Sequence, residues 1–367
     1  MNTEMVVQQD LDYICRNLKE ELAQMSGKRV LITGGAGFLG YYLLQALLHA
    51  AKVDKNLKPI EVVVLDNAIR GLPGWFRQLL KEGRFTFLQQ DITKPLTSAL
   101  GAYQYIIHAA SIASPTFYRQ FPIETMDANV NGLRQLLEYS RAHLAKILEG
   151  FLYFSSSEIY GDPSADEIPT KETYRGNVSC TGPRACYDES KRYGETLCVN
   201  FAEQHHLPVK IVRPFNNFGP GLLITDKRVI PDFASNILNN QDIVILSNGD
   251  PTRTFCYVAD AVVGYVKVLV RGHQAEPYNI GVDKPEISMR QLAEEMVAMA
   301  RELWGYQGKV VFKQSTDQEY LTDSPNRRCP VIEKARLDLA YQPGIDLKEG
   351  LRRSLNWYRH YQDGVKP

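Results

Sequence analysis

The stretch "RVLITGGAGFLG" at residues 29–40 places an apolar segment directly before a run of glycines, and the glycines directly before a second apolar pattern. A buried strand, a tight glycine turn and an amphipathic helix in this order form the first unit of a dinucleotide-binding fold. The glycines let the backbone approach a pyrophosphate, and the helix N-terminus offers free N–H groups. We therefore predict a pyrophosphate site that contains Gly34, Gly37, Phe38, Leu39 and Gly40.

Short apolar segments alternate with helical patterns over the first two-thirds of the chain. The predicted strands are 29–33, 60–66, 85–91, 103–110, 150–157 and 209–214, and the predicted helices are 38–51, 123–146 and 186–205. Apolar strands that alternate with helices form a parallel sheet with helices on both faces. The fold class predicted is therefore α/β, with a Rossmann-type doubly wound parallel sheet over residues 28–214.

After about residue 215 the elements become shorter and Pro and Gly become frequent, as in "RPFNNFGPG". Helices are predicted at 229–240, 258–271, 288–304 and 346–361, with short strands at 243–246 and 309–313. We expect residues 215–367 to form a smaller mixed α/β substrate-binding lobe, some segments of which return to the first domain.

Residues 1–27 precede the first strand and carry apolar side chains at helical spacing. These are Val7, Leu11, Ile14, Leu18, Leu22 and Met25. The pattern predicts an amphipathic helix that packs on its own domain or on a partner subunit. It has early acids and no apolar centre, so it does not read as a signal peptide. No apolar run reaches the ~20 residues of a membrane span, and we expect no membrane partner.

The charge balance gives no sign of a nucleic-acid partner, because Lys plus Arg and Asp plus Glu each number 42. Six cysteines are spread along the chain, and none forms a Cys-x-x-Cys pair. We read them as free thiols of a reducing compartment, expect a cytoplasmic protein and assign no metal site.

An acid at the end of the second strand of such a fold binds the adenosine ribose. Asp66 in "VVVLDN" has this position, and Asn67 follows it. Because an acid there repels the extra phosphate of NADP, the predicted cofactor is NAD. Asp91 and Ile92 follow the third strand, where the adenine is expected. Ala109 lies in "HAAS", whose small residues permit close approach to the cofactor.

The stretch "ACYDESKRYGE" places Tyr187 four residues before Lys191. Positions i and i+4 share one helix face, about 5–6 Å apart at Cβ. An ammonium and a nicotinamide ring nearby would lower the pKa of the phenol, which could then take a proton from a sugar or alcohol hydroxyl while hydride passes to NAD. A hydroxyl from "FSSSEIYG", which offers Ser155, Ser156 and Ser157, would hold the substrate oxygen. The alternative is a solvated surface pair.

The order of these features resembles the extended short-chain dehydrogenase/reductase family, in its nucleotide-sugar-modifying branch, from residue 28 to about 360. The motifs are "TGGAGFLG", "SSSEIYGDP", "RPFNNFGPG" and "GDPTRTFCYVADAV". "GPRACYDESKRYGETL" is similar to the matching segment of UDP-glucuronate decarboxylases, which make UDP-xylose. The resemblance implies that Ser156 is the catalytic hydroxyl, Tyr187 the base and Lys191 its partner.

This resemblance also implies a reaction that opens with oxidation at sugar C4. Dehydratases of the branch use an Asp-Glu pair where this chain has Ser157 and Glu158, which argues against dehydration. A decarboxylase needs fewer catalytic groups, because a ketone at C4 makes the sugar acid a β-keto acid, which loses carbon dioxide readily. Glu158 and Arg328 are then expected to position the carboxylate end. Arg328 lies in "NRRCPVI", where Cys and Val replace polar neighbours found in the family.

The same resemblance assigns substrate contacts to Tyr118 in "ASIASPTFYRQFP", Asn216 in "PFNNFG" and Arg253 in "PTRTF". Arg192, next to Lys191, is a further candidate for the acidic sugar. We expect a UDP-hexuronate as the nucleotide-sugar substrate, with C4 epimerisation as the first alternative and a non-catalytic NAD-binding scaffold as the second. A homodimer that pairs through helices 123–146 and 186–205 is implied as well.

Overall fold

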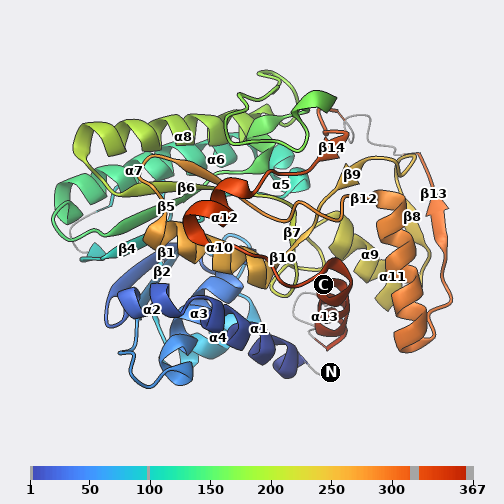
Figure 1. The fold of residues 1–367 in the computed structure, drawn as a ribbon, viewed down its shortest axis with the longest axis horizontal. Helices are drawn as coiled ribbons and strands as arrows, with labels where there is room; N and C mark the ends of the chain where they lie inside the picture. The colour runs from blue at the N-terminus through green and yellow to red at the C-terminus, as the bar shows by residue number, and fades with distance from the viewer. Residues whose placement is uncertain (1–2, 97–99, 315–321, 361–367) are drawn as a thin grey trace.

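Seven parallel strands form one sheet in the order β3, β2, β1, β4, β5, β6, β11 (Figure 1). The structure is a computed structural model that describes residues 3–96, 100–314 and 322–360. The strands are β1 (Arg29–Thr33), β2 (Glu61–Asp66), β3 (Thr86–Gln89), β4 (Tyr105–His108), β5 (Gly150–Phe154), β6 (Val209–Pro214) and β11 (Pro277–Ile280). This doubly wound order confirms the predicted fold class, and it brings the carboxyl ends of β1 and β4 side by side at the switch point.

The strands are apolar on both faces because each face is covered by helices. Val30 and Ile32 of β1 belong to one hydrophobic core, whereas Leu31 between them belongs to the other. Figure 1 shows α8 (Ala185–His205) with the α6–α7 helix on one face, and α3 (Phe38–Val53) with α10 (Val258–Arg271) on the other. The helices predicted at 38–51, 186–205 and 258–271 therefore match α3, α8 and α10 closely.

The helix predicted as one piece at 123–146 is divided by two π-helical turns. Its parts are α6 (Pro122–Asp127), η2 (Ala128–Gly132), α7 (Leu133–Tyr139) and η3 (Ser140–Leu144). Gly132 lies where this helix crosses close to the loop after β3. A Cβ at Gly132 would come within 2.7 Å of the Ile92 side chain, so the glycine permits this close approach.

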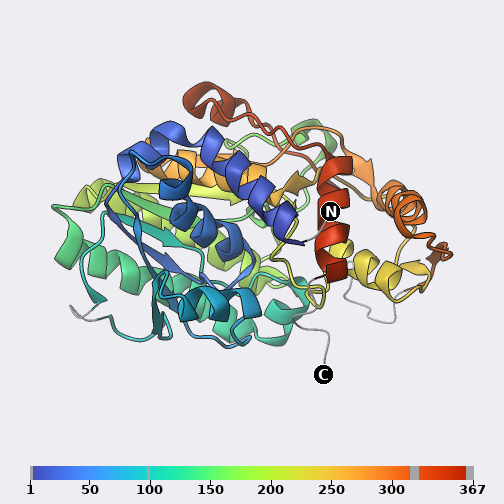
Figure 2. The same ribbon diagram turned by 90° about the horizontal axis from the view of Figure 1, so that it is seen from below.

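The second lobe lies beside the carboxyl end of the sheet (Figures 1 and 2). It contains α9 (Val229–Leu238), α11 (Met289–Trp304), α13 (Leu347–His360), β8 (Ile243–Ile245) and β13 (Val310–Phe312), together with a small sheet of β12 (Ile287–Ser288), β9 (Thr252–Arg253) and β14 (Arg327–Arg328). The last residue of the helix predicted at 346–361 lies outside the described residues. β11 leaves the lobe and pairs with β6, so the chain crosses between the two parts more than once.

Shorter elements complete the chain. They are α4 (Gly74–Lys81), α5 (Pro115–Gln120), η4 (Ser157–Tyr160), η5 (Ala165–Glu167), β7 (Asn217–Phe218), β10 (Cys256–Tyr257) and α12 (Glu333–Leu339). Two of them, α5 and η4, come after the sheet strands β4 and β5 and border α8. They therefore bring the carboxyl edge of the sheet to the helix that contains Tyr187 and Lys191.

The N-terminal extension forms two helices rather than one, α1 (Thr3–Asn17) and α2 (Lys19–Met25), which meet at Leu18. Residues 1 and 2 lie outside the described residues. α1 packs against α3, α10 and α13 of the same chain, and Figure 2 shows it next to α13. Of the two alternatives drawn from the sequence, packing on its own domain is therefore what the structure contains.

A fully buried acid anchors this extension. Asp10 of α1 accepts hydrogen bonds from the hydroxyls of Tyr42 (2.5 Å) and Tyr257 (2.6 Å) and from Nη1 of Arg353 (2.5 Å). Burial raises the pKa of Asp10, although all three partners act in the opposite direction. Because Tyr42, Tyr257 and Arg353 lie on α3, β10 and α13, one carboxylate ties the extension to both parts of the molecule.

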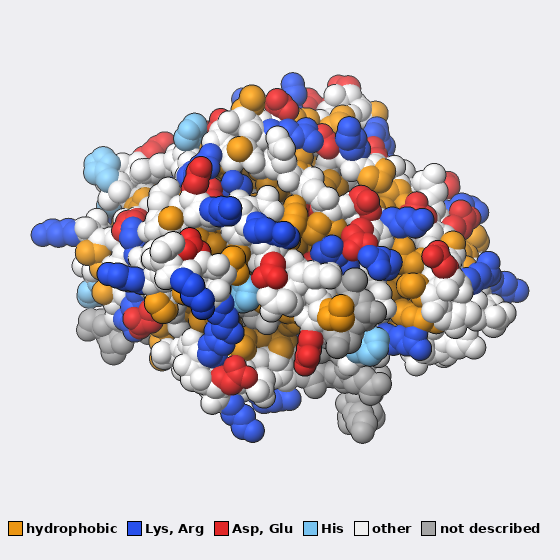
Figure 3. All heavy atoms as spheres, turned by 60° about the horizontal axis from the view of Figure 1, so that its bottom comes forward, with side chains coloured by type: hydrophobic (Ala, Val, Ile, Leu, Met, Phe, Trp, Pro, Cys, Tyr) orange, Lys and Arg blue, Asp and Glu red, His pale blue; other side chains and the backbone are white. Residues whose placement is uncertain are grey.

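Acidic and basic side chains are interspersed over the face shown in Figure 3, with small hydrophobic areas between them. This agrees with the equal numbers of acidic and basic residues, 42 each. Within the described ranges, none of the helices combines the length and the apolar character that a membrane span requires.

Candidate active site

The glycine loop between β1 and α3 leaves no space for a side chain at Gly34 or at Gly40. A Cβ at Gly34, whose φ is +72°, would lie 2.6 Å from Cα of Ala110, and a Cβ at Gly40 would lie 2.1 Å from the carbonyl oxygen of Gly35. Gly37 is the N-cap of α3, and no side chain caps this helix end. The uncapped N–H groups and the bare backbone fit the pyrophosphate of a dinucleotide.

The acid predicted to bind ribose lies beside this loop. Asp66 ends β2, and its carboxylate accepts the backbone N–H groups of Ala36 at 3.1 Å and Ala68 at 2.9 Å. Burial raises the pKa of Asp66, and these two N–H groups oppose the rise. The carboxylate is thus held in a fixed position next to the glycine loop, as a ribose-binding acid requires.

The other predicted cofactor residues surround the same edge of the sheet. Phe38 and Leu39 form the first turn of α3, and the Asn67 side chain accepts the N–H of Ile69. Asp91 accepts both the N–H and the hydroxyl of Thr93, Ile92 is buried, and Ala109 continues from β4 beside Gly34. Their contacts with a cofactor remain predictions.

Tyr187 and Lys191 share one face of α8, as their spacing predicts. Both are buried, and Nζ of Lys191 lies 5.7 Å from the centroid of the Tyr187 ring. Nζ donates a hydrogen bond of 2.7 Å to the carbonyl oxygen of Phe154, at the end of β5. The surface-pair alternative is therefore wrong, and the lysine is fixed against the strand that precedes the three serines.

Without a cofactor, the folded chain does not give the Tyr187 phenol a low pKa. Burial raises the pKa of Tyr187 to about 12, although the hydroxyl of Ser156 opposes the rise. Burial lowers the pKa of Lys191 to about 7. Desolvation outweighs the neighbouring charge here, because both groups are enclosed by the protein.

Among the three serines, Ser156 is the one next to Tyr187. It is the N-cap of η4, and its Oγ accepts the N–H of Glu158 at 3.2 Å while it also interacts with the Tyr187 hydroxyl. Ser155 and Ser157 are buried as well. The structure thus brings together the hydroxyl, the phenol and the ammonium that the sequence assigned to one site.

Glu158 lies between two arginines. Arg328 of β14 donates two hydrogen bonds of 2.5 Å to its carboxylate, and Nη2 of Arg184 donates to the same group. Burial acts to raise the pKa of Glu158, but Arg184 and Arg328 hold it well below its usual 4.5. Glu158 is therefore ionised at neutral pH, and the two guanidinium groups converge on a single point beside Tyr187.

Tyr118 covers the other side of this cluster. It is almost fully buried, and its ring stacks on the Tyr187 ring, while the Arg184 guanidinium lies 5.8 Å from the Tyr118 centroid. Within the described part of the chain, the Tyr118 hydroxyl has no hydrogen-bond partner. An unpartnered buried hydroxyl at this point fits a polar ligand.

Arg253 of β9 lies close enough to Arg328 and Glu158 to interact with their charges. Its side chain donates hydrogen bonds to backbone carbonyl groups. Its guanidinium donates to the backbone oxygens of Thr252, Pro325 and Asn326. No carboxylate among the described residues forms an ion pair with it. Burial and the charge of Arg328 lower the pKa of Arg253 to about 9, so an anionic ligand would be favoured here.

The family model described as the NAD dependent epimerase/dehydratase family matches residues 30–281. The chain belongs to this family. It is 36% identical over 326 residues to UDP-glucuronic acid decarboxylase 6 of Arabidopsis thaliana, and the match covers 89% of this chain and 87% of the relative. It is 35% identical over 338 residues to UDP-glucuronic acid decarboxylase 1 of Xenopus tropicalis, with 92% and 74% covered.

A solved structure of UDP-glucuronic acid 4-epimerase from Bacillus cereus, in complex with UDP-glucuronic acid and NAD, has the same fold. It is 26% identical, with a TM-score of 0.72 over 90% of this chain and 98% of the other. As a member of the NAD dependent epimerase/dehydratase family, the chain is an enzyme that uses NAD, in agreement with the sequence prediction.

Two of the predicted substrate residues of this epimerase/dehydratase family member have different surroundings from those expected. Arg192 donates to the carbonyl oxygens of Ile159 and Arg175, and the structure does not bring it to the arginine cluster. It follows Lys191 by one position and therefore points about 100° further round the helix. Asn216 has φ of +40°, and its side chain donates to the carbonyl of Thr254 at 2.9 Å.

Arg184 is the site residue that the sequence analysis missed. It is the N-cap of α8, three residues before Tyr187, and it lies within "GPRACYDESK", where the motif gave it no role. Its Nε lies 3.8 Å from Oδ2 of Asp188. The signal that could have found it was this i,i+4 pair of opposite charges next to the tyrosine.

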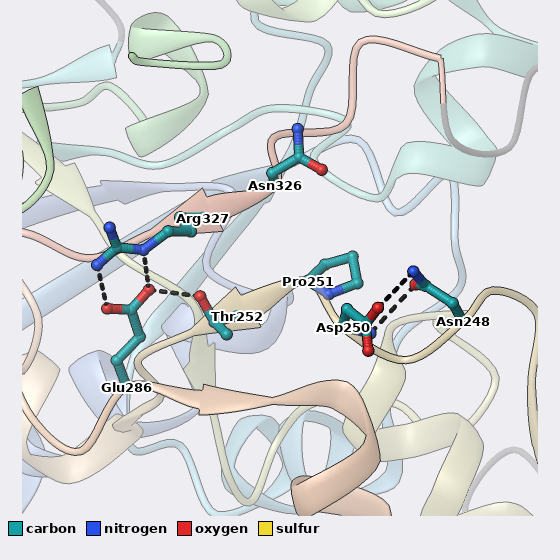
Figure 4. Close-up of a pocket in the computed structure, with 7 residues that line it drawn as sticks. All are labelled: Asn248, Asp250, Pro251, Thr252, Glu286, Asn326 and Arg327. Carbon is teal, nitrogen blue, oxygen red and sulfur yellow. Dashed lines mark hydrogen bonds and ion pairs between the residues drawn. The ribbon is translucent and has the colours of Figure 1, made fainter. Parts of the chain in front are cut away.

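A polar pocket lies on the opposite face of β9 from Arg253, since Thr252 and Arg253 are neighbours on one strand. Figure 4 shows its lining residues, Asn248, Asp250, Pro251, Thr252, Glu286, Asn326 and Arg327. Glu286 accepts hydrogen bonds from Thr252 and Arg327 there. Because the two charges pair with each other, this pair gives the pocket no excess charge, and the pocket lies apart from the Glu158 cluster.

Proposed function

We propose that this enzyme decarboxylates UDP-glucuronate to UDP-xylose by transient oxidation at C4 of the sugar. The observation that carries the proposal is the convergence of Arg184 and Arg328 on Glu158 beside Tyr187. Two buried guanidinium groups at the base are suited to a substrate that carries a carboxylate of its own. The two relatives named above, both called UDP-glucuronic acid decarboxylases, support the same reaction.

Oxidation at C4 begins at Tyr187 and Ser156. The glycine loop and Asp66 would hold NAD, which would supply the acceptor for the hydride of C4 and its donor in the last step. Tyr187 removes the proton of the C4 hydroxyl, and Ser156 holds the same oxygen through a hydrogen bond. The ammonium of Lys191, 5.7 Å from the ring centroid, stabilises the phenolate that proton removal requires.

The carboxylate is lost from the resulting β-keto acid. The bond between C5 and C6 breaks, carbon dioxide leaves, and the electron pair moves into the ketone to give an enolate. Tyr187 and Ser156 donate hydrogen bonds to the enolate oxygen, which stabilises the charge that develops there. C5 then takes up a proton, and hydride returns to C4 to give the pentose.

The remaining site residues hold the substrate. Arg253 binds the diphosphate, because its charge lacks a carboxylate partner within the described residues. The Tyr118 hydroxyl contacts the sugar acid, and Glu158 positions the two arginines around the sugar carboxylate. Ser157, at the position of an acid in dehydratases, leaves no second carboxyl there to protonate a departing C6 hydroxyl.

C4 epimerisation of the same acidic sugar is the second candidate. The Bacillus cereus structure named above favours it, because that epimerase was solved in complex with UDP-glucuronic acid. Both reactions share the C4 oxidation, so the residues around Tyr187 serve either one.

Incubation of the NAD-loaded enzyme with UDP-glucuronate tests both candidates. Decarboxylation gives carbon dioxide and a product with a C5 methylene in proton NMR. Epimerisation gives a product that keeps the carboxylate and has an inverted C4. If UDP-glucuronate and other nucleotide hexuronates are all recovered unchanged, both candidates are wrong.

We also propose that the enzyme is a homodimer that pairs through α6–α7 and α8. The support is a group of exposed apolar side chains on these helices and next to them, with exposures of 41% for Phe121, 60% for Ile123 and 47% for Tyr193. Light scattering that gives the mass of one chain would contradict it.

A reducing compartment, the cytoplasm, is proposed as the place of action. All six cysteines are free, and four of them are buried in the hydrophobic interior. Thiol titration of protein purified without reductant should find six free thiols in the unfolded chain.

A further inference from the structure

Asp188 is a buried acid for which the mechanism above has no task. It lies in the first turn of α8, directly after Tyr187, and is 3% exposed. Its Oδ2 is 3.8 Å from Nε of Arg184, too far for a hydrogen bond. Within the residues described, neither Oδ1 of Asp188 nor Nε of Arg184 has a hydrogen-bond partner. A buried acid and a buried donor thus stand unsatisfied next to the proposed base.

The positive charges around Asp188 can neutralise only one carboxylate besides that of Glu158. Arg184 and Arg328 carry two positive charges, and Glu158 balances one of them. An ionised Asp188 would balance the other, and a substrate carboxylate would then be buried without a countercharge, which is costly. A protonated Asp188 leaves one positive charge for the substrate.

The remaining groups near Asp188 do not change this balance. Asp323, in the segment before β14, adds negative charge near Asp188, and Arg253 faces Glu158 but is assigned to the diphosphate. In the protein without cofactor, Tyr118 and Tyr187 add no negative charge, since burial raises the pKa of both phenols. Burial and the carboxylate of Glu158 raise the pKa of Asp188 to about 8, although the two arginines oppose the rise. The protonated form is therefore accessible near neutral pH.

We propose that Asp188 is a proton-linked specificity residue: it is protonated whenever a hexuronate carboxylate occupies the arginine pair, and it can ionise only when that carboxylate is absent. This inference rests on the proposed function. Under this proposal, binding of the acidic sugar depends on pH through Asp188, which lies near Arg184. It does not depend on the ionisation of Tyr187.

The proton count of decarboxylation agrees with this role. The substrate enters with one negative charge on its sugar, carbon dioxide leaves without charge, and C5 takes up one proton. The pentose product therefore no longer needs the positive charge of the arginines. At a pH above its pKa, Asp188 can then release its proton to the solvent, and its carboxylate restores the neutral arginine cluster.

Calorimetric titration measures the proton directly. UDP-glucuronate is titrated into the NAD-loaded Tyr187→Phe protein, which binds without turnover, in buffers of different ionisation enthalpy. At pH 9 we expect uptake of about one proton per site, and at pH 6.5 none, because Asp188 with a pKa of about 8 is already protonated there. The dissociation constant should rise about tenfold between pH 7 and pH 9.

Two comparisons isolate Asp188. UDP-glucose, which lacks the carboxylate, should bind without proton uptake, and this controls for Lys191 and for the diphosphate. Tyr187→Phe with Asp188→Asn, an uncharged isostere, should bind UDP-glucuronate with no uptake and with a dissociation constant that does not change from pH 7 to 9. Binding without uptake in the Tyr187→Phe protein, or uptake that persists with Asp188→Asn, would overturn the inference. Failure of UDP-glucuronate to bind at all would instead overturn the proposed function, and the inference with it.

Discussion

The ring of Tyr118 lies parallel to the ring of Tyr187, with 4.9 Å between their centroids and 12° between their planes. Tyr118 belongs to α5 and Tyr187 to α8, so the stack fixes the loop after β4 against the start of the helix that carries the proposed base. Stacked aromatic pairs contribute about 0.5–1.5 kcal/mol beyond their burial. The proposed base thus gains a fixed ring orientation from Tyr118, which is itself proposed to contact the substrate.

Tyr187→Phe should remove turnover and leave NAD binding intact. The substitution deletes the hydroxyl that takes the C4 proton but keeps the stacked ring, and we expect kcat to fall about a hundredfold to ten-thousandfold. Steady-state assay with UDP-glucuronate measures the loss, and fluorescence titration measures NAD binding. Activity near that of the unaltered enzyme would show that another group is the base.

Arg253→Gln should weaken the binding of UDP, and Arg327→Gln should not. The two arginines lie on neighbouring strands of the small sheet, but Arg327 pairs with Glu286 in the pocket of Figure 4. Loss of a charge-assisted contact costs about 1.5–3 kcal/mol, which is about a tenfold to hundredfold change in dissociation constant. Calorimetry with UDP alone measures it. Equal effects of the two substitutions would contradict the assignment of Arg253 to the diphosphate.

Lys191→Met should change how stability depends on pH. The folded protein lowers the pKa of Lys191 from 10.5 to about 7, so the unfolded chain binds more protons between these values. The free energy of unfolding therefore rises with pH above 7, by at most about 1.4 kcal/mol per pH unit from this group. Urea denaturation of cofactor-free protein from pH 7 to 9 should show that rise, and Lys191→Met should lack it. Parallel curves for the two proteins would mean that Lys191 is charged throughout.

Asp10→Asn should destabilise the whole protein, because Asp10 joins α1 to α3, β10 and α13. Removing one partner of a buried ion pair costs about 3–5 kcal/mol. Asp12→Asn on the same helix is the matched control. Its side chain is 43% exposed, so its pair with His49 should contribute less than about 1 kcal/mol. Equal shifts in the urea midpoint for the two variants would contradict the anchoring role.

The sequence predicted the parts of the site that follow from local periodicity. The four-residue spacing of Tyr187 and Lys191 places them on one helix face wherever the helix packs, and the glycine pattern requires a tight loop regardless of its neighbours. Resemblance supplied Glu158 and Arg328, which lie 170 residues apart and meet only through β14. No local pattern contains that meeting.

The sequence did not show how deeply individual charged and titratable side chains are buried. Arg184 was missed, and the raised pKa of Tyr187 in the chain without cofactor was not predicted, because each depends on how completely the surrounding residues exclude water. The apolar stripe of the extension predicted a helix, but charged residues are rarely fully buried, so nothing marked Asp10 as its anchor.

The pair between Asp10 and Arg353 spans 343 positions of the chain. During synthesis, Asp10 therefore leaves the ribosome long before Arg353. The extension can therefore complete its packing only after the residues between Asp10 and Arg353 have been translated, and a nascent chain stalled before α13 would keep Asp10 without its arginine partner.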